Sequence, residues 1–457
     1  MKTSYISHAS LAKAFNKDEE RVNWHDETLW TIRQRRDMRV QQVPGWEELR
    51  EMASQIKNNV LSNLHDYLLQ FEENAVKNGI TVHWASDADE HNQIIHSILK
   101  KNGINRMVKS KSMLTEECRL NEYLKDRGVE VIDSDLGERI IQLALQRPTH
   151  IVLPAIHLKK EEIGEIFHKH LGTPEGLSDP QQLTEVARQH LREIFLTRKA
   201  ALTGVNFGIA ETGEFVVCTN EGNADMGAHL ADVHIASMGL EKLVPRREHM
   251  GIFLRLLARS ATGQPITTYS SHFSVPRKGQ EMHIVLVDLG RTRQLGREDF
   301  RASLKCIKCA ACMNTCPVYR KSGGYSYQHT IAGPIGSILA PNLDMEKHKS
   351  LPFASTLCGS CSNVCPVKID IHQQLYKWRQ EIVKSGHAAS SKKISMKIMA
   401  GILNAPLMYR LSGRMMRWML RYMPGFINNK MNAWYRQRDM PAAPKTSFSD
   451  WYRKNYK

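Results

Sequence analysis

Cysteines spaced for iron–sulfur chemistry lie in two short runs in the last third of the chain. The first run reads CIKCAACMNTCP and contains Cys306, Cys309, Cys312 and Cys316. Its spacing, C-x2-C-x2-C-x3-C-P, is that of the bacterial iron–sulfur run, in which the fourth cysteine serves the other cluster of a pair. A zinc ribbon also uses paired C-x2-C motifs, but it does not need four cysteines in this spacing followed by proline.

The second run reads STLCGSCSNVCP and repeats the spacing with a serine, Ser355, at its first position. Because each run lends its last cysteine to the other cluster, the spacing predicts two crossed ligand sets. The first cluster is bound by Cys306, Cys309, Cys312 and Cys365. The second is bound by Cys358, Cys361 and Cys316, with Ser355 at a fourth position that is vacant of a thiolate.

Three thiolates leave the type of the second cluster open. It is a [4Fe–4S] cluster whose fourth iron takes a serine oxygen, a water or a partner's group, or it is a [3Fe–4S] cluster. The alternative for Ser355 is an ordinary loop or helix-capping serine. The remaining cysteines, Cys118 and Cys218, are interpreted as small buried apolar side chains.

Composition places these runs in a globular protein. The chain has 457 residues, of which 42% are hydrophobic and 24% are charged. It has no apolar run long enough to span a bilayer, and its first residues have no apolar core typical of a secretory signal. Clustered thiols in a long chain indicate metal binding rather than a disulfide scaffold. We therefore expect a cytoplasmic protein.

The spacing of apolar residues predicts how the chain is organised. Residues 1–78 are helical in pattern, and five short apolar segments then alternate with helical stretches. These predicted strands are 80–85, 128–134, 149–157, 215–223 and 282–290. Such alternation favours a mostly parallel sheet. We predict four parts: an N-terminal helical segment (1–78), an α/β domain (79–296), a cysteine-containing helical domain (297–380) and a basic C-terminal region (381–457).

The two runs, together with segments such as VKSKSMLTEE (108–117), GVNFGIAETGEFVVCTNEGN (204–223) and MHIVLVDLGR (282–291), resemble the lactate-utilization protein B family. The resemblance covers nearly the whole chain. It implies an α/β LUD domain, of the ribose-5-phosphate isomerase and CoA-transferase type, followed by an α-helical ferredoxin domain with two [4Fe–4S] clusters. It also implies two companion subunits with which the protein oxidises L-lactate to pyruvate.

Several residues of the LUD region are candidates for a small-molecule site. Glu221 follows a strand, where CoA transferases place a nucleophile, although a carboxylate there is commonly a cap. The run Lys109 to Ser112 could bind an anion or form a solvated turn. The segments 262–264 and 288–291 could line the same pocket. His150 and His157 flank a predicted strand and are interpreted as structural.

The C-terminal region carries most of the formal charge of +16, because eleven Lys and Arg and no acidic residue lie between Lys384 and Arg438. Ile394, Ile398 and Ile402 fall on one helical face, and the arginines from Arg410 to Arg421 recur on another. This pattern predicts a basic amphipathic helix pair that is interrupted near Pro406. It favours docking to an anionic membrane surface at the inner face, or to an acidic partner. No nucleic-acid-binding signature accompanies the charge.

We therefore expect a non-catalytic electron-transfer component of a multi-subunit lactate-oxidising complex, which relays electrons through its clusters. No dinucleotide fingerprint indicates a flavin or nicotinamide of its own. Two alternatives remain open: a LUD-domain transferase or isomerase with accessory clusters, and a cluster-based redox sensor.

Overall fold

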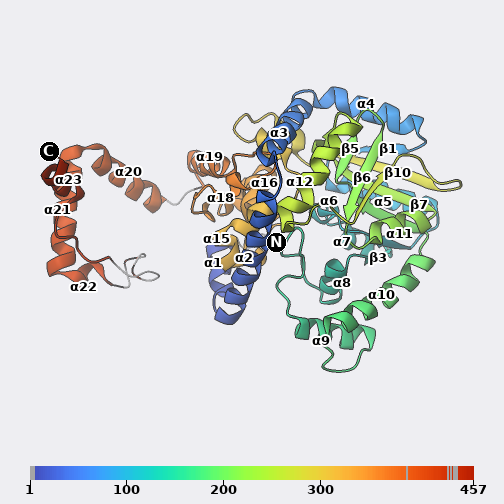
Figure 1. The fold of residues 1–457 in the computed structure, drawn as a ribbon, viewed down its shortest axis with the longest axis horizontal. Coiled ribbons are helices and arrows are strands. Elements are labelled where there is room, and N and C mark those ends of the chain that lie inside the picture. The colour runs from blue at the N-terminus through green and yellow to red at the C-terminus, as the bar shows by residue number, and fades with distance from the viewer. Residues whose placement is uncertain (1–5, 388–389, 430–431, 433–434, 436–440, 457) are drawn as a thin grey trace. The chain divides into compact units, whose positions relative to one another are not determined.

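The computed structural model of the chain describes residues 6–387, 390–429, 432, 435 and 441–456. The chain divides into two compact units, Met1–Glu381 and Ile382–Lys457. The first unit holds the N-terminal helices, the α/β region and both cysteine runs (Figure 1). The finer division at 78 and 296 stays a prediction.

A six-stranded, all-parallel sheet lies at the centre of the α/β region. Its strand order is β1-β10-β7-β4-β2-β3. The bounds are β1 (Thr81–Ala85), β2 (Arg106–Lys109), β3 (Glu130–Asp133), β4 (Ala200–Gly204), β7 (Val233–Gly239) and β10 (Glu281–Val287). The central strand β7 is buried along its whole length. This is expected of a parallel sheet that is covered on both faces.

Helices cover the two faces of this sheet with separate apolar cores. One face packs against α5 (Ala88–Lys101), α6 (Met113–Glu117) and α7 (Leu120–Lys125), through residues such as Ile95, Leu99 and Leu124. The other packs against α10 (Pro180–Thr197) and α11 (Asn223–Leu230). The helices α8 (Leu136–Leu143) and α9 (Lys160–Leu171) and the segment around Leu158 form a smaller core with α10.

A smaller sheet of four strands lies beside the main one. Its order is β8-β5-β6-β9, with bounds β5 (Phe207–Ile209), β6 (Glu214–Thr219), β8 (Leu243–Val244) and β9 (Tyr269–Phe273). The helices η1 (Leu240–Lys242), η2 (Arg247–His249), α12 (Met250–Thr262) and α13 (Arg291–Leu295) complete this region. The predicted strand at 215–223 thus belongs to an antiparallel arrangement rather than to the parallel sheet.

The cysteine region is built from short helices joined by tight loops. Its elements are η3 (Arg301–Lys305), α14 (Ala311–Thr315), α15 (Pro317–Ser322), η4 (Gly324–Tyr327), α16 (Gly333–Leu343), α17 (Met345–His348), η5 (Leu351–Phe353), α18 (Ser360–Asn363) and α19 (Ile371–Lys384).

The N-terminal helices are α1 (His8–Phe15), α2 (Glu19–Gln41), α3 (Trp46–Ser62) and α4 (Leu64–Lys77). Helices α2 and α3 share a hydrophobic core with the cysteine region, whereas α4 packs in a core of the α/β region. Leu29 of α2, Ala53 of α3 and Phe253 of α12 belong to the same buried cluster as Cys312 and Trp378. The first helices of the chain therefore form one wall around the last cysteines, and α2 runs alongside α15 in Figure 1.

The predicted strand at 149–157 is wrong, because this segment forms turns. His150 Nδ1 accepts hydrogen bonds from the backbone N–H groups of Val152 and Leu153, each at 3.0 Å. The N–H of Thr149 donates to the carbonyl of Pro154 at 3.2 Å. These local bonds occupy backbone groups that a sheet would pair, and proline cannot donate to a ladder.

The second unit consists of α20 (Ser390–Asn404), α21 (Pro406–Tyr422), α22 (Pro424–Ile427) and α23 (Phe448–Tyr456). Helix α21 starts at Pro406, where the sequence predicts an interruption. Its apolar side chains are largely exposed, including Leu407, Leu411 and Trp418. Over the residues that the structure describes, no helix has the length and apolar content needed to cross a bilayer.

Candidate iron–sulfur site and adjoining cavity

The two cysteine runs fold into loops with matching backbone conformations. Lys308 and Ala310 have φ of 60° and 65° in the first loop, and Leu357 and Gly359 have φ of 56° and 78° at the same positions of the second. Left-handed φ is uncommon outside glycine and gathers at functional sites. A short helix then follows in each run, α14 or α18. The second loop therefore repeats the first, with Ser355 at the position of Cys306.

A local hydrogen bond is repeated as well. The N–H of Lys308 donates to Cys306 Sγ at 3.4 Å, and the N–H of Leu357 donates to Ser355 Oγ at 3.1 Å. Ser355 is half-buried, and its hydroxyl accepts the bond that a ligating sulfur accepts in the other loop. This hydrogen bond would form whether Ser355 is a plain loop residue or a cluster ligand. The role of Ser355 therefore stays a prediction.

Four cysteines form one electrostatic group. Burial raises the pKa of Cys309, and the Cys365 thiolate raises it further. Burial also raises the pKa of Cys365 to about 11, with Cys306 adding to the effect. For Cys312, burial is again the largest cause, followed by Cys306 and Cys309, with smaller effects of Cys361 and Cys365. Charges influence one another in this way only at short range, so Cys365 of the second run lies among the cysteines of the first.

The remaining three cysteines form a second group. Burial raises the pKa of Cys361 to about 12, and the next largest cause is Cys316. Burial raises the pKa of Cys316 as well, and Cys358 contributes in the same direction. The grouping of Cys316 with Cys358 and Cys361 is the one expected for the crossed ligand sets, which stay a prediction.

The donor set fits a cluster chemically. Backbone N–H groups of Tyr319 and Ile369 donate to Cys316 Sγ and Cys365 Sγ at 3.5 and 3.4 Å. Hydrogen bonds to cysteine sulfur favour the thiolate and tune the potential of a bound cluster. Among the described residues, no three His, Cys, Asp or Glu side chains are placed to hold one single metal ion. A cubane cluster does not need such a site, because each of its thiolates binds a different iron.

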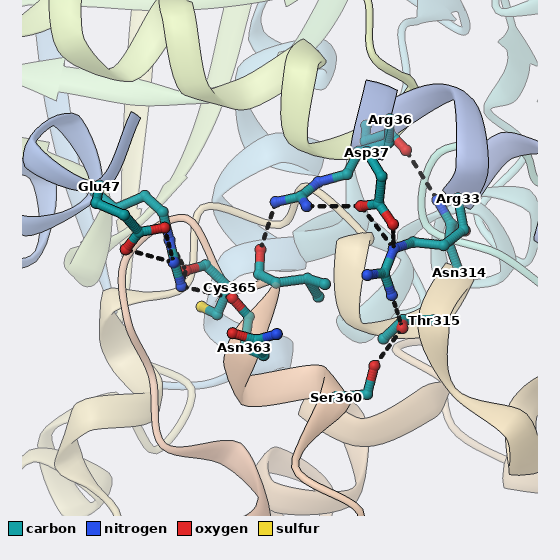
Figure 2. Close-up of polar contacts among 12 residues, drawn as sticks. Arg33, Arg36, Asp37, Glu47, Asn314, Thr315, Ser360, Asn363 and Cys365 are labelled. Carbon is teal, nitrogen blue, oxygen red and sulfur yellow. Dashed lines mark hydrogen bonds and ion pairs between the residues drawn. The ribbon is translucent and has the colours of Figure 1, made fainter. Parts of the chain in front are cut away.

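Two buried arginines from the N-terminal helices hold the second cysteine loop. Arg50 of α3 donates to the carbonyl of Cys365 at 2.8 and 3.0 Å and to that of Asn363 at 2.7 Å. Arg36 of α2 donates to the carbonyl of Val364 at 3.3 Å. Three consecutive carbonyls are thus satisfied from outside the loop, as Figure 2 shows. Glu47 accepts from Arg50 at 2.6 Å and fixes its orientation.

A third arginine contacts the junction of the two runs. Arg33 ion-pairs with Asp37 at 2.8 Å and donates to Thr315 Oγ1. Thr315 precedes Cys316, and its hydroxyl is hydrogen-bonded at 2.5 Å to that of Ser360, which precedes Cys361 (Figure 2). The two loops are therefore joined directly where the second group of cysteines meets.

Sequence reasoning missed these arginines. The stretch RQRRDMR (33–39) reads as a solvated charged face, and charge alone does not reveal which members are buried. Arg36 and Arg50 are each only 7% exposed. The one signal available was that both lie among apolar residues at helical spacing, since Arg50 follows Leu49 and precedes Ala53.

A cavity of about 540 Å³ lies between the LUD region and the first cysteine loop. It opens at the carboxyl ends of strands β2, β3, β4 and β7, where ligands bind in open α/β sheets. Gly204 and Gly239 end two of these strands. Side chains from the LUD region form most of the lining, and Lys308 and Cys309 of the cysteine loop complete it.

The structure gathers most of the LUD candidates around this cavity. Ser110, Lys111, Ser112, Thr262, Gln264, Arg291 and Glu221 all line it. Lys109 does not, because it is buried in ion pairs with Glu116 at 2.7 Å and Asp133 at 2.8 Å. Asp288 caps Thr292 instead, accepting from its N–H at 2.7 Å. Glu221 accepts from the N–H of Leu136 at 3.0 Å, which is a capping contact.

The two histidines have structural environments. His150 Nε2 is hydrogen-bonded to Asn314 Oδ1 at 2.8 Å, and burial lowers the pKa of His150 to about 3. His157 is bonded to Thr149 and Gln146, and burial lowers its pKa to about 4. Cys118 is buried in the sheet core, while Cys218 is partly buried and lines the cavity.

A buried carboxyl in the cavity wall gives a pH-dependent prediction. Glu138 is 8% exposed; burial raises its pKa from 4.5 to about 7, against the opposing charge of Lys111 at 3.0 Å. Between pH 4.5 and about pH 7, Glu138 is deprotonated in the unfolded chain and protonated in the folded chain. The free energy of unfolding therefore falls as pH rises through this window, by about 3 kcal/mol from this group.

Glu138→Gln cannot ionise and should gain stability relative to the parent protein between pH 5.5 and pH 8. Urea unfolding followed by circular dichroism on anaerobic protein at both pH values measures the difference. An identical pH dependence for variant and parent would contradict the assignment.

Comparisons with known proteins agree with this architecture. A family model described as LUD domain matches residues 68–290, one described as 4Fe-4S dicluster domain matches 302–369, and one described as lactate utilisation protein B, C-terminal, matches 375–457. The predicted order of α/β LUD domain, iron–sulfur region and helical tail is confirmed.

Similar proteins match along most of their length. Lactate utilization protein B of Oceanobacillus iheyensis is 42% identical over 434 residues, which covers 92% of this chain and 90% of that protein. The protein of the same name from Bacillus cytotoxicus is 40% identical over 430 residues, which covers 91% of this chain and 90% of that protein. A DUF162 family protein from Deinococcus radiodurans, of known structure, is 17% identical, with a TM-score of 0.27 over 49% of this chain and 98% of that one. At these levels of identity and coverage, the chain belongs to the lactate utilization protein B family.

Proposed function

We propose that the protein is an iron–sulfur electron-transfer subunit of a system that oxidises L-lactate to pyruvate. In this proposal it works with two companion subunits and passes electrons to a downstream acceptor. The lactate role is supported by the names of the similar proteins. The observation that carries the electron-transfer role is that six of the seven cysteines, from two separate runs, lie in or against one buried core, with the exposed Cys358 close to Cys361.

The bound clusters would supply one-electron chemistry, and the chain would supply position and environment. Apolar residues such as Met313, Ile335 and Val364 keep water from the cysteine loops. Arg36 and Arg50 place positive charge beside them, and charge near a cluster sets its potential. Cys358 is exposed, so the second cysteine group approaches the surface, where a partner can exchange electrons.

Reduction by lactate tests the proposal. The full chain, reconstituted anaerobically with iron and sulfide, is mixed with its two companion subunits and L-lactate, and reduced-cluster signals are followed by EPR. We expect signals with the companions present and none with the chain alone.

Turnover of an acyl-CoA or sugar phosphate by the isolated chain, lost in Glu221→Gln, would favour the enzyme alternative. Specific DNA binding that changes on cluster loss would favour the sensor.

Ser355→Cys tests the nature of the second cluster. A thiolate at this position would complete eight ligands, so iron content should rise to about eight per chain if the parent holds about seven. If the parent already holds about eight, the added thiolate should lower the potential of the second cluster. Thr356→Cys, one residue further along and exposed, is the matched control and should change neither value. Equal effects of the two substitutions would contradict the ligand position.

We also propose that the second unit docks on an anionic membrane surface. On α21 the apolar side chains Leu407, Leu411, Met415, Trp418 and Tyr422 are all more than half exposed. They form one helical stripe, and Arg410, Arg414, Arg417 and Arg421 form the stripe next to it. An apolar face flanked by arginines matches the boundary between acyl chains and anionic headgroups.

Truncation after Gly386 should leave the clusters intact and abolish binding to vesicles that contain anionic phospholipid. Changing the four arginines of α21 to glutamine in the full chain should weaken binding about 1,000-fold, since each contributes about 1 kcal/mol. Vesicle flotation measures both effects. Retained flotation after truncation would discard the membrane proposal, and a pull-down with the companion subunits would then test a protein partner.

A further inference from the structure

The LUD cavity has the size and lining of a ligand site. Its volume of about 540 Å³ lies within the range of small-molecule pockets, about 300–1,000 Å³. Apolar side chains form much of its wall, among them Met113, Leu136, Ile140, Val152 and Leu257. Such a wall suits an apolar body considerably larger than a three-carbon acid.

Two lysines in the cavity wall have no hydrogen-bonded or ion-paired partner in the described part of the chain. Lys242 and Lys308 both line the cavity, and neither ammonium has a hydrogen-bond or ion-pair partner among the residues that the structure describes. Burial lowers the pKa of Lys242, the carboxylate of Glu241 opposes this effect, and the charge of Lys308 lowers the pKa again, so the two lysines lie close together near Glu241.

The other cations of the cavity are already paired. Arg291 is bound by Glu241 at 2.5 Å and Glu117 at 3.2 Å. Lys111 is bound by Glu138 at 3.0 Å and by the carbonyl of Val152 at 3.1 Å. Lys242 and Lys308 are therefore the lysines left to bind an anion from outside, since ammonium groups bind carboxylates through charge-assisted hydrogen bonds.

A polar group without a partner lies in the wall as well. Ser110 is 4% exposed and its hydroxyl has no hydrogen-bond partner within the described part of the chain. Buried polar groups are rarely left in this state. Ser110 lines the cavity at the end of β2, where a ligand could supply the missing bond.

We propose that this cavity binds an organic carboxylate with a large apolar or aromatic body, with its carboxylate on Lys242 and Lys308. Because Lys308 and Cys309 belong to the first cysteine loop, the anion would lie against the first cluster. Negative charge at that point would lower the cluster's reduction potential. The binding step is independent of the lactate role, whereas the effect on potential rests on the proposed function.

Titration calorimetry of the anaerobic, cluster-loaded full chain tests the binding step. The probe is 2-naphthoate, and its neutral counterpart 2-naphthalenemethanol and L-lactate serve as comparison ligands. We expect 2-naphthoate to bind at one site per chain and at least tenfold more tightly than either comparison ligand. Equal binding of the acid and the alcohol, or tighter binding of lactate, would overturn the proposal.

Substitutions locate the site. Lys242→Met and Lys308→Met should each weaken 2-naphthoate binding by about 10- to 100-fold, the loss expected for one hydrogen bond to a charged group. Lys100→Met, an exposed lysine of α5 that does not line the cavity, is the matched control and should bind normally. Absorbance and iron content establish that each variant carries its clusters. Unchanged affinity in both cavity variants would overturn the proposal.

A redox titration separates ligand binding from a purely electrostatic role of the lysines. With 2-naphthoate present, the midpoint potential of the first cluster should fall, and the shift should disappear in Lys242→Met. If the two substitutions change the potential while 2-naphthoate affects neither potential nor heat, the lysines serve only to balance cluster charge and the proposal fails. Lactate-dependent reduction, measured without 2-naphthoate, would remain as the independent test of the proposed function.

Discussion

Cys365→Ala is expected to remove the cluster bound by the first cysteine run, although Cys365 belongs to the second. Its thiolate is electrostatically grouped with Cys306 and Cys309, and its sulfur accepts from the N–H of Ile369 at 3.4 Å. Without it the first cluster would lose one of four thiolates. Iron content should fall by about four per chain, and lactate-dependent electron transfer should fall to background.

Cys316→Ala is the reciprocal variant. Cys316 belongs to the first run by sequence but is grouped with Cys358 and Cys361. The substitution should remove the second cluster, which already has only three thiolates, and leave the first. Alanine is preferred to serine in both variants because a serine oxygen could itself bind iron.

EPR and iron analysis of the anaerobic proteins distinguish the two outcomes, because each variant should keep a different signal. Cys118→Ala, a buried cysteine far from both runs in sequence and outside their core, is the control and should retain all iron. If Cys365→Ala loses the same signal as Cys358→Ala, each run holds its own cluster and the crossed assignment is wrong.

Arg50→Met should destabilise the second cysteine loop strongly. The guanidinium satisfies the carbonyls of Asn363 and Cys365 at 2.7 and 2.8 Å, and the side chain is 7% exposed. The carbonyl of Cys365 keeps the N–H of Lys368 at 3.2 Å, whereas that of Asn363 is left without a donor among the described residues. A buried carbonyl in this state costs about 1–3 kcal/mol. The loop should open more often, and a chelator should extract iron at least tenfold faster.

Loss of the charge-transfer absorbance in the presence of EDTA, under anaerobic conditions, measures the extraction rate. The ammonium of Arg50→Lys lacks the fork of donors that reaches both carbonyls, so its extraction rate should lie between those of the parent and Arg50→Met. Arg188→Met removes an exposed arginine that is paired only with Glu185 on its own helix, and it should behave as the parent does. Equal rates for Arg50→Met and Arg188→Met would show that the arginine does not hold the loop.

Spacing alone was enough to identify the ligand loops and to propose how they cross. Cysteines at fixed intervals before a proline restrict the chain to a narrow set of turns. The spacing can therefore be recognised in the sequence without knowledge of the fold. The amphipathic tail was predictable for a similar reason, because the break at Pro406 and the arginine repeat are both local features. The parallel α/β region followed from alternation of apolar segments, though with errors.

The errors in the predicted strands have two physical reasons. The segment 149–157 has the composition of a strand, but His150 and Pro154 commit its backbone to turns. The strands β4 (AALTG) and β7 (VHIASMG) were missed because alanine, serine and glycine interrupt the run of large apolar residues from which the other strands were predicted.

The sequence by itself determined where the two cysteine loops lie and which residues are predicted to bind the clusters, since the spacing that predicts them acts within about a dozen residues. Only the tertiary structure decided that Arg36 and Arg50, over 300 residues away, hold the second cysteine loop. It also decided that Lys242 of the LUD region and Lys308 of the first loop line one cavity. The partners of a charged residue are not visible in the sequence, because they are set by elements that meet only when the chain is folded.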